Sequence, residues 1–158
     1  MNQEQINSFI GGSAVVLIVW LILSALLIFV NNQLSFPVYG NELSRGLGIV
    51  LFAVGLVATL LIVGEHFKTG RVTPVAVEKP IKFIATGLYR YSRNPMYLTI
   101  LLTFFGGWLV FGHLLLFIYV LLAIPAVNLI VIYMEEPELK KIFEKEYEEY
   151  LKRVPRWL

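Results

Sequence analysis

The sequence predicts an all-α, polytopic membrane protein with about four transmembrane helices, a cytoplasmic loop and an amphipathic C-terminal helix. Of the 158 residues, 58% are hydrophobic and only 15% are charged, whereas soluble domains carry roughly 25% charged residues. The apolar residues form uninterrupted blocks, and most charged residues lie in one internal stretch and at the C-terminus. We therefore expect the bilayer to be the main solvent of a single membrane-embedded domain over residues 1–158.

The first two predicted spans lie at about 10–30 and 47–63. The apolar run 10–30 is long enough to cross roughly 30 Å of hydrocarbon as a helix. A cleaved signal peptide is the alternative, but the segment before the run contains Glu4 and no Lys or Arg, so we expect a retained helix. Polar residues, Pro and Gly in 31–40 predict a short connection to the second span.

A helical hairpin is expected next. Residues 97–134 contain no Asp, Glu, Lys or Arg, and as one helix they would be about 57 Å long, nearly twice the hydrocarbon thickness. The chain must therefore fold back, and Phe-Gly-His at 111–113 is the natural turn. This predicts spans at about 95–111 and 114–134, the latter with a kink near Pro125.

Two polar segments flank this hairpin. Residues 64–94 carry many basic residues, Pro and Gly, which predicts a long aqueous or interfacial loop. The tail 135–158 is densely charged, and we expect it to form a helix that begins near Pro137 and lies along the membrane surface. The apolar residues near one face of that helix are Leu139, Ile142, Phe143, Tyr147, Tyr150 and Leu151.

The distribution of basic residues predicts the orientation. Of the 13 Lys and Arg residues, all but Arg45 lie in the central loop or the tail. The positive-inside rule then places both termini of a multi-pass protein in the cytoplasm, and in the cell inner membrane if the protein is bacterial. The net charge of +2, with acidic and basic residues interleaved, argues against a nucleic-acid partner. The oligomeric state is not predicted.

Several kinds of chemistry are disfavoured. The chain has no cysteine, and its two histidines, His66 and His113, fit no metal-ligand spacing, so no metal site is predicted. A Rossmann fingerprint is missing, because Gly46-Leu-Gly48 is followed by Leu51 where the third glycine should stand. Small residues that pack two helices together explain this pair of glycines better.

The candidate site lies where the end of the loop meets the start of the tail. Residues 87–97 read Gly-Leu-Tyr-Arg-Tyr-Ser-Arg-Asn-Pro-Met-Tyr, and the tail begins with Glu135 and Glu136. Taken singly, each of these residues is explained at least as well by anchoring at the membrane boundary. As a set they suit a zwitterionic, aromatic ligand, since carboxylates bind an amine or ribose hydroxyls and a guanidinium binds a carboxylate.

Residues 86–97 resemble the Arg-His-Pro-x-Tyr motif region of isoprenylcysteine carboxyl methyltransferases and related phospholipid methyltransferases. The tail supports this likeness, because Glu135-Glu-Pro-Glu-Leu139 looks like the acidic pair of that family. Phe143, Tyr147, Tyr150 and Arg153-Val-Pro155 then look like the Phe, Tyr, Tyr and Arg-Val-Pro positions that follow it. The resemblance covers roughly half of the chain.

The resemblance implies an S-adenosyl-L-methionine-dependent methyltransferase with a helical cofactor region at about 86–98 and 135–155. The acceptor would be a lipophilic small molecule or lipid delivered by the bilayer: an isoprenylcysteine-like carboxylate, a thiol or a phospholipid amine. Arg93 or Arg153 would orient an anion, and Glu136 would hold the amine or accept a proton; these three are the candidate catalytic residues. The candidate cofactor-binding residues are Leu88, Tyr89, Arg93, Asn94, Pro95, Tyr97, Leu98, Glu135, Glu136, Tyr147 and Tyr150.

Two departures from the family pattern bear on the mechanism. Asn94 stands in place of the usual His, which removes a titratable group but keeps hydrogen bonding. Val131 stands where many relatives have a basic residue, so the acceptor is left open. Asn128, Thr99 and Thr103 either line an access route or, as we favour, form helix-helix hydrogen bonds. The alternative functions are a membrane reductase with a nicotinamide cofactor and a non-catalytic membrane adaptor.

Overall fold

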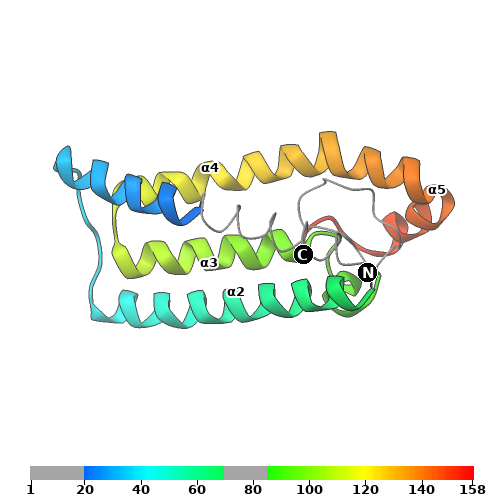
Figure 1. Cartoon of the computed structure of the whole chain (residues 1–158), viewed down its shortest axis with the longest axis horizontal. Coiled ribbons are helices and arrows are strands. Elements are labelled where there is room, and N and C mark those ends of the chain that lie inside the picture. Colours follow the sequence, from blue (N-terminus) through cyan, green and yellow to red (C-terminus); the bar gives the residue numbers. More distant parts are fainter. Residues whose placement is uncertain (1–19, 70–84) are drawn as a thin grey trace.

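The computed structural model describes residues 20–69 and 85–158, and the regular structure in this part of the chain is helical, which confirms the all-α fold class. In Figure 1, α2, α3 and α4 run side by side, and the helix Trp20–Gln33 lies beside α4. In chain order this helix is followed by α2 (Glu42–Thr69), the 3-10 helix η1 (Gly87–Arg90), α3 (Pro95–Phe111), α4 (Leu114–Ile130), the π-helical turn η2 (Val131–Glu135) and α5 (Glu136–Arg153).

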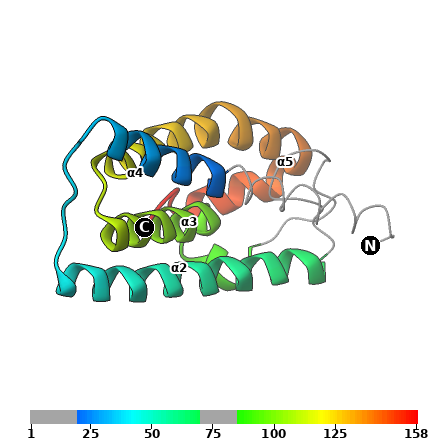
Figure 2. The same cartoon turned by 60° about the vertical axis from the view of Figure 1, so that its left-hand side comes forward.

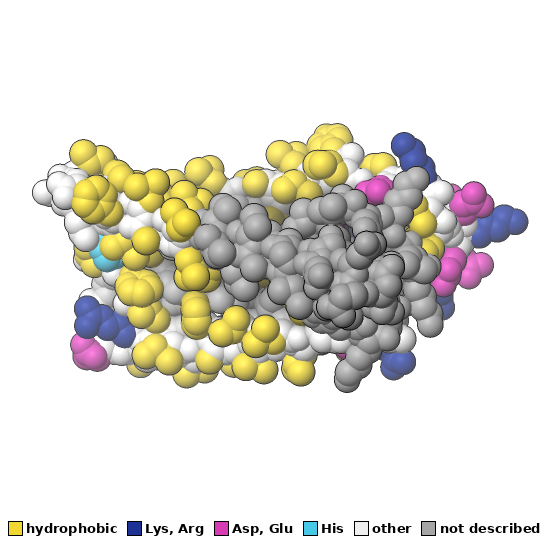
Figure 3. Space-filling model, in the orientation of Figure 1, with side chains coloured by type: hydrophobic (Ala, Val, Ile, Leu, Met, Phe, Trp, Pro, Cys, Tyr) yellow, Lys and Arg dark blue, Asp and Glu magenta, His cyan; other side chains and the backbone are white. Residues whose placement is uncertain are grey.

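Two helical stretches are long and apolar enough to cross a membrane: Glu42–His66 in α2, and Leu114–Arg153, which runs through α4, η2 and α5. The helices Trp20–Gln33 and Pro95–Phe111 are apolar but shorter. Large apolar side chains face outward: Leu61 is 66% exposed and Leu122 is 64% exposed. Figure 3 shows such side chains over much of the surface, with charged side chains gathered mainly at one end. A surface of this kind suits hydrocarbon better than water.

The bounds of the first two helices differ from the predicted spans. The helix Trp20–Gln33 includes the polar residues 31–33, which form its last turn. Likewise α2 extends beyond the predicted span 47–63 at both ends. At its start, Ser44 N donates to Asn41 Oδ1 and Asn41 N donates to Ser44 Oγ, both at 2.9 Å. This reciprocal cap begins the helix before the apolar run.

At the other end, α2 continues to Thr69, so the prediction of a loop from residue 64 is wrong for 64–69. Helix formation does not require apolar residues, and a helix packed on its neighbour extends into a polar segment at little cost. The remaining predicted loop residues 70–84, and residues 10–19 of the first predicted span, lie outside the described residues.

The predicted start of the tail helix near Pro137 is confirmed, because α5 begins at Glu136. The chain is helical from α4 through η2 into α5, and Pro125 lies inside α4. In the widened turn η2, Glu136 N donates to Val131 O, five residues back. Pro137 sits in the first turn of α5, where its missing N–H costs little. A π turn therefore accommodates the proline where the sequence predicts a helix boundary.

The chain reverses inside α5. Glu144 has φ 41° and ψ −115°, and the second half of α5 folds back at the right-hand end of Figure 1. The reversal gathers the apolar side chains of the tail into a cluster with Ala85, formed by Leu139, Phe143, Tyr147, Tyr150, Leu151 and Val154. The predicted apolar face of the tail is confirmed as a packing surface, but across a chain reversal. Its position at the membrane surface stays a prediction.

Close approach of two backbones defines the α2–α3 interface. A Cβ atom on Gly106 would lie 2.4 Å from Phe52 N, and one on Gly48 would lie 2.8 Å from Gly106 O. The hydroxyls of Thr59 and Thr99 hydrogen-bond at 2.8 Å across the same interface. Small-residue packing is thus confirmed at Gly48 but not at Gly46, where a Cβ atom would meet nothing within 4 Å. Helix-helix hydrogen bonding is confirmed at Thr99 but not at Thr103, whose hydroxyl donates to Thr99 O of its own helix. In contrast, α3 contacts α4 at far fewer positions.

The hairpin predicted at 111–113 is confirmed, with α3 ending at Phe111 as predicted. Gly112 has φ 72° and ψ 0°, the left-handed conformation that favours glycine. Its carbonyl accepts a hydrogen bond from Tyr39 N at 2.8 Å, and a Cβ atom there would overlap Tyr39 O. The hairpin and the connection between the first two helices are therefore joined at this end of the bundle (Figure 2).

Candidate functional site

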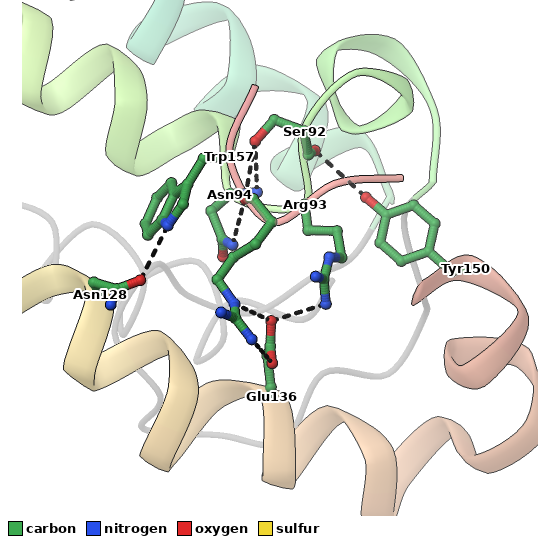
Figure 4. Close-up of polar contacts among 8 residues, drawn as sticks. Ser92, Arg93, Asn94, Asn128, Glu136, Tyr150 and Trp157 are labelled. Carbon is green, nitrogen blue, oxygen red and sulfur yellow. Dashed lines mark hydrogen bonds and ion pairs between the residues drawn. The ribbon is translucent and has the colours of Figure 1, made fainter. Parts of the chain in front are cut away.

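A buried ionic cluster lies where the start of α3 meets the start of α5. The Glu136 carboxylate accepts hydrogen bonds from Arg93 Nη1 at 2.8 Å, from Arg156 Nε at 2.8 Å and from Arg156 Nη2 at 2.9 Å (Figure 4). The side chains of Glu136, Arg93 and Arg156 are 14%, 13% and 33% exposed. We call these three residues the Glu136 triad. With one carboxylate and two guanidiniums, the triad has a formal net charge of +1.

The guanidiniums keep Glu136 ionised. Burial raises the pKa of Glu136, but the hydrogen bond from Arg156 and the positive charges of Arg93, Arg156 and Lys140 outweigh burial, and the pKa lies below its ordinary value. The hydrogen bond to Glu136 in turn raises the pKa of Arg156. At neutral pH Glu136 and Arg156 are therefore both charged.

The backbone of the C-terminal segment holds Arg156 in place. Arg93 N donates to Pro155 O at 2.9 Å, so the residues before α3 run against the residues after α5. Arg156 O accepts hydrogen bonds from Ser92 Oγ at 3.2 Å and from Asn94 Nδ2 at 2.9 Å. Asn94, the residue that replaces the family's His, thus binds the C-terminal segment through its amide. The side chains of both Ser92 and Asn94 are buried.

Two further hydrogen bonds fix this segment from either side. The Tyr150 hydroxyl donates to Tyr89 O at 2.6 Å. Trp157 Nε1 donates to Asn128 Oδ1 at 3.0 Å (Figure 4). Asn128 belongs to α4, so this hydrogen bond joins α4 to the C-terminal segment. The expected helix-helix hydrogen bond of Asn128 is not what the structure shows, because its partner Trp157 lies beyond the end of α5.

A second acidic group lies next to the triad. The Tyr97 hydroxyl, on the first turns of α3, donates a hydrogen bond to Glu135. Glu135 ends η2 and Glu136 begins α5, and successive helical residues point about 100° apart. The two neighbouring carboxylates therefore bind different partners at the same end of the bundle.

Aromatic side chains surround these groups. Tyr89, Tyr147 and Tyr150 are buried, with 7%, 2% and 4% of their surfaces exposed. His66 Nε2, near the end of α2, lies 3.0 Å from the Tyr89 hydroxyl, and His66 is 3% exposed. No sequence motif includes His66, because the predicted loop begins before it. The longer α2 brings this histidine under η1.

Most candidate residues lie in or beside this region, including Tyr89, Arg93, Asn94, Pro95, Tyr97, Glu135, Glu136, Tyr147 and Tyr150. Leu98 is half-buried in the first turn of α3, whereas Leu88 is 42% exposed in η1. Arg153 is exposed, donates to Glu149 O at 3.3 Å and lies outside the Glu136 triad.

Sequence reasoning missed Arg156 as well as Ser92 and Trp157. One signal for Arg156 was available in the motif itself. Pro155 cannot continue a helix, so the residue after it is free to leave the helical path and turn toward the bundle. Arg153 lies before that proline and stays on the exposed side of α5.

The fold and the cluster define a class of protein: an all-helical membrane protein with an ionic and aromatic cluster closed by its own C-terminal segment. A family model described as phospholipid methyltransferase matches residues 43–146, about two thirds of the chain. The chain belongs to the phospholipid methyltransferase family, which implies a methyltransferase with a lipid-related substrate. Searches of curated proteins and of solved structures found no match. The matched region contains Arg93, Glu135 and Glu136 and ends before Tyr147, Arg153 and Arg156.

Proposed function

We propose that the protein transfers the methyl group of S-adenosyl-L-methionine to a lipophilic acceptor delivered by the bilayer. One observation carries this proposal: adjacent positions hold groups of opposite net charge. The Glu136 triad has a formal charge of +1, and the hydrogen-bonded Tyr97–Glu135 pair beside it has a formal charge of −1. A methionyl group offers a carboxylate and an ammonium a few bonds apart, so it matches this pattern.

The triad also has capacity for an anion. The buried Nε of Arg93 makes no hydrogen bond within the described residues, whereas Nη1 of the same side chain is bound to Glu136. A carboxylate beside Arg93 would satisfy this donor. We therefore assign the cofactor's carboxylate to Arg93 and its amine to Glu135.

This arrangement narrows the role of Glu136. Its carboxylate accepts three hydrogen bonds from guanidiniums, and its pKa lies below the ordinary value. A group of this kind is a poor proton acceptor near neutral pH. Glu136 then acts by positioning Arg93 and Arg156. Arg153, on the exposed side of α5, is left as a contact for an anionic acceptor.

The buried rings of Tyr89, Tyr147 and Tyr150 supply aromatic surface for an adenine, and Leu88, Asn94, Pro95 and Leu98 complete the proposed cofactor-binding set. The bound cofactor supplies an electrophilic methyl group on a sulfonium. The chain contributes orientation and exclusion of water, which account for a large share of the rate in such transfers.

The acceptor is a carboxylate of the isoprenylcysteine type, a thiol or a phospholipid amine. Val131 is fully buried in η2, so this chain offers no cation at that position to recognise a carboxylate. The proposal retains four spans with both termini in the cytoplasm, which puts the cluster at the cytoplasmic surface, where the cofactor is available.

Equilibrium binding of S-adenosylhomocysteine to detergent-purified protein tests the site. Arg93→Ala removes the proposed carboxylate ligand but leaves the Arg156–Glu136 pair, so the fold should persist and affinity should fall about tenfold or more. Arg153→Ala is the matched control and should change affinity by less than about twofold. Equal affinity in wild type and Arg93→Ala would refute the site. Saturable binding of a nicotinamide cofactor instead would favour the reductase, and binding of neither would favour the adaptor.

A further inference from the structure

An apolar cavity of about 240 Å³ lies in the half of the bundle away from the Glu136 triad. The helix Trp20–Gln33, α3 and α4 provide most of its wall. Aromatic rings dominate that wall: the Trp20 and Phe104 rings stack with centroids 4.7 Å apart, and the Phe104 and Tyr119 rings lie 5.6 Å apart. A cavity with so little polar surface does not hold water well and favours an apolar occupant.

The cavity lies next to the outer surface of the bundle. Leu21 and Phe111 line it and are 59% and 54% exposed. The neighbouring α3–α4 interface has few close contacts compared with the α2–α3 interface. A hydrocarbon chain lying in the membrane can therefore reach the cavity without separating the tightly packed helices.

Its distance from the ionic cluster is set by α3. Phe104 and Phe111 follow Pro95 by nine and sixteen residues along one continuous helix. At 1.5 Å per residue these positions lie roughly 14 and 24 Å from the start of α3. An extended chain gains roughly 1.2 Å per bond, so roughly 12 to 20 bonds join the cluster to the cavity.

We propose that this cavity binds the distal end of a hydrocarbon chain of the acceptor and thereby selects acceptors by chain length. The inference rests on the proposed function, because it assumes that the acceptor's reactive group lies at the Glu136 triad. A chain that is too short leaves the aromatic wall without contacts, and a chain of the right length fills it.

Gly107 provides a substitution that fills the cavity. This residue lines the cavity, and a Cβ atom there would lie 3.8 Å from Phe52 Cδ2, an ordinary contact. Gly107→Leu therefore adds a side chain to the cavity wall without a backbone clash. Gly46→Leu is the matched control, since a Cβ atom on Gly46, in α2, meets nothing within 4 Å.

The experiment uses fatty acids with bromine on the terminal carbon, which quench tryptophan fluorescence on contact. Trp20 and Trp108 line the cavity, so a sixteen-carbon probe should quench saturably and more tightly than an eight-carbon probe. Gly107→Leu should weaken the sixteen-carbon probe about tenfold, the cost of excluding one to two methylenes, and Gly46→Leu should not. Quenching that is linear in probe, equal for both lengths or unchanged in Gly107→Leu would overturn the proposal.

Binding of S-adenosylhomocysteine, measured on the same samples, separates the two proposals. Gly107→Leu should leave that binding unchanged, because Gly107 is more than three helical turns from Pro95. Saturable, length-dependent quenching without S-adenosylhomocysteine binding would support the chain site and refute the proposed cofactor. Cofactor binding without length-dependent quenching would refute the chain site alone.

Discussion

The two interfaces of α3 are built in opposite ways. Toward α2, glycines let the backbones approach so closely that a Cβ atom on Gly106 has no room, and a Thr59–Thr99 hydrogen bond crosses the interface. Toward α4, contacts are few, and an apolar cavity lies at the edge of the interface. The first interface has the small-residue packing expected of a fixed scaffold in lipid. The α3–α4 interface instead leaves space for the apolar cavity.

The open α3–α4 interface is joined at its two ends by different means. The tight turn at Gly112 closes one end covalently. At the other end, the Glu136 triad and the Tyr97–Glu135 hydrogen bond connect α3 to the continuation of α4. The polar groups that we assign to the cofactor are thus also the groups that hold these helices together. Site and stability should therefore respond to the same substitutions.

The largest effect is expected for Glu136→Ala. This change leaves the guanidiniums of Arg93 and Arg156 close together without a counter-ion in a largely buried site. Removing one partner of a buried ion pair costs 3 to 5 kcal/mol, and we expect about 3 kcal/mol here because the site keeps some exposure to water. Denaturation in mixed micelles should show the loss, together with loss of S-adenosylhomocysteine binding.

Glu148→Ala is the control for this comparison. Glu148 lies on the same helix, but its side chain is exposed, so its loss should change the free energy of unfolding by less than about 0.5 kcal/mol. A Glu136→Ala protein as stable as Glu148→Ala would show that the triad does not hold the open interface.

Much of the scaffold could be predicted from the sequence because it depends on local composition. The bounds of α3 and the hairpin follow from an apolar run too long for one span and from a Phe-Gly-His turn. The helix ends were harder to predict. Polar segments such as 64–69 extend a helix when its neighbour supports it. The start of α5 at Pro137 was predicted, but the π turn at Val131–Glu135 that joins α4 to α5 was not.

The candidate site was predicted in part for a similar reason. Residues within the recognisable motifs, such as Arg93 and Glu136, lie together as their order along the hairpin suggests. Arg156 was missed because its position depends on a chain reversal at Glu144 and on backbone pairing with the residues before α3. Neither feature has a local sequence signal, and the family motif points to Arg153 instead.

The second prediction concerns the tightly packed α2–α3 interface. It uses two adjacent glycines of α3. Gly106→Ala puts a methyl group 2.4 Å from Phe52 N, so α2 and α3 must separate, at a cost of about 1 to 3 kcal/mol. Gly107→Ala meets Phe52 only at 3.8 Å and should be neutral or stabilising by up to about 1 kcal/mol, because alanine favours the helix. The same unfolding titration compares them. Equal effects would mean that the backbones of α2 and α3 do not pack closely at Gly106.

The smallest predicted effect is a pH dependence confined to the open interface. The pKa of Glu136 is lower in the folded protein than its ordinary value of 4.5. The ionised carboxylate therefore stabilises the fold at any pH above this ordinary value. This contribution is lost as pH falls through the lowered pKa, when the folded protein must take up a proton and the hydrogen bonds from Arg93 and Arg156 weaken.

Glu136→Gln lacks the titrating group. The difference in unfolding free energy between wild type and Glu136→Gln should therefore be constant from pH 8 to about 6 and shrink below about pH 5. Gly107→Ala, whose substitution lies beside the uncharged cavity, should follow wild type across this range. If wild type and Glu136→Gln lost stability in parallel, other carboxylates would carry the acid sensitivity, and the triad would not be the electrostatic connection between α3 and α5.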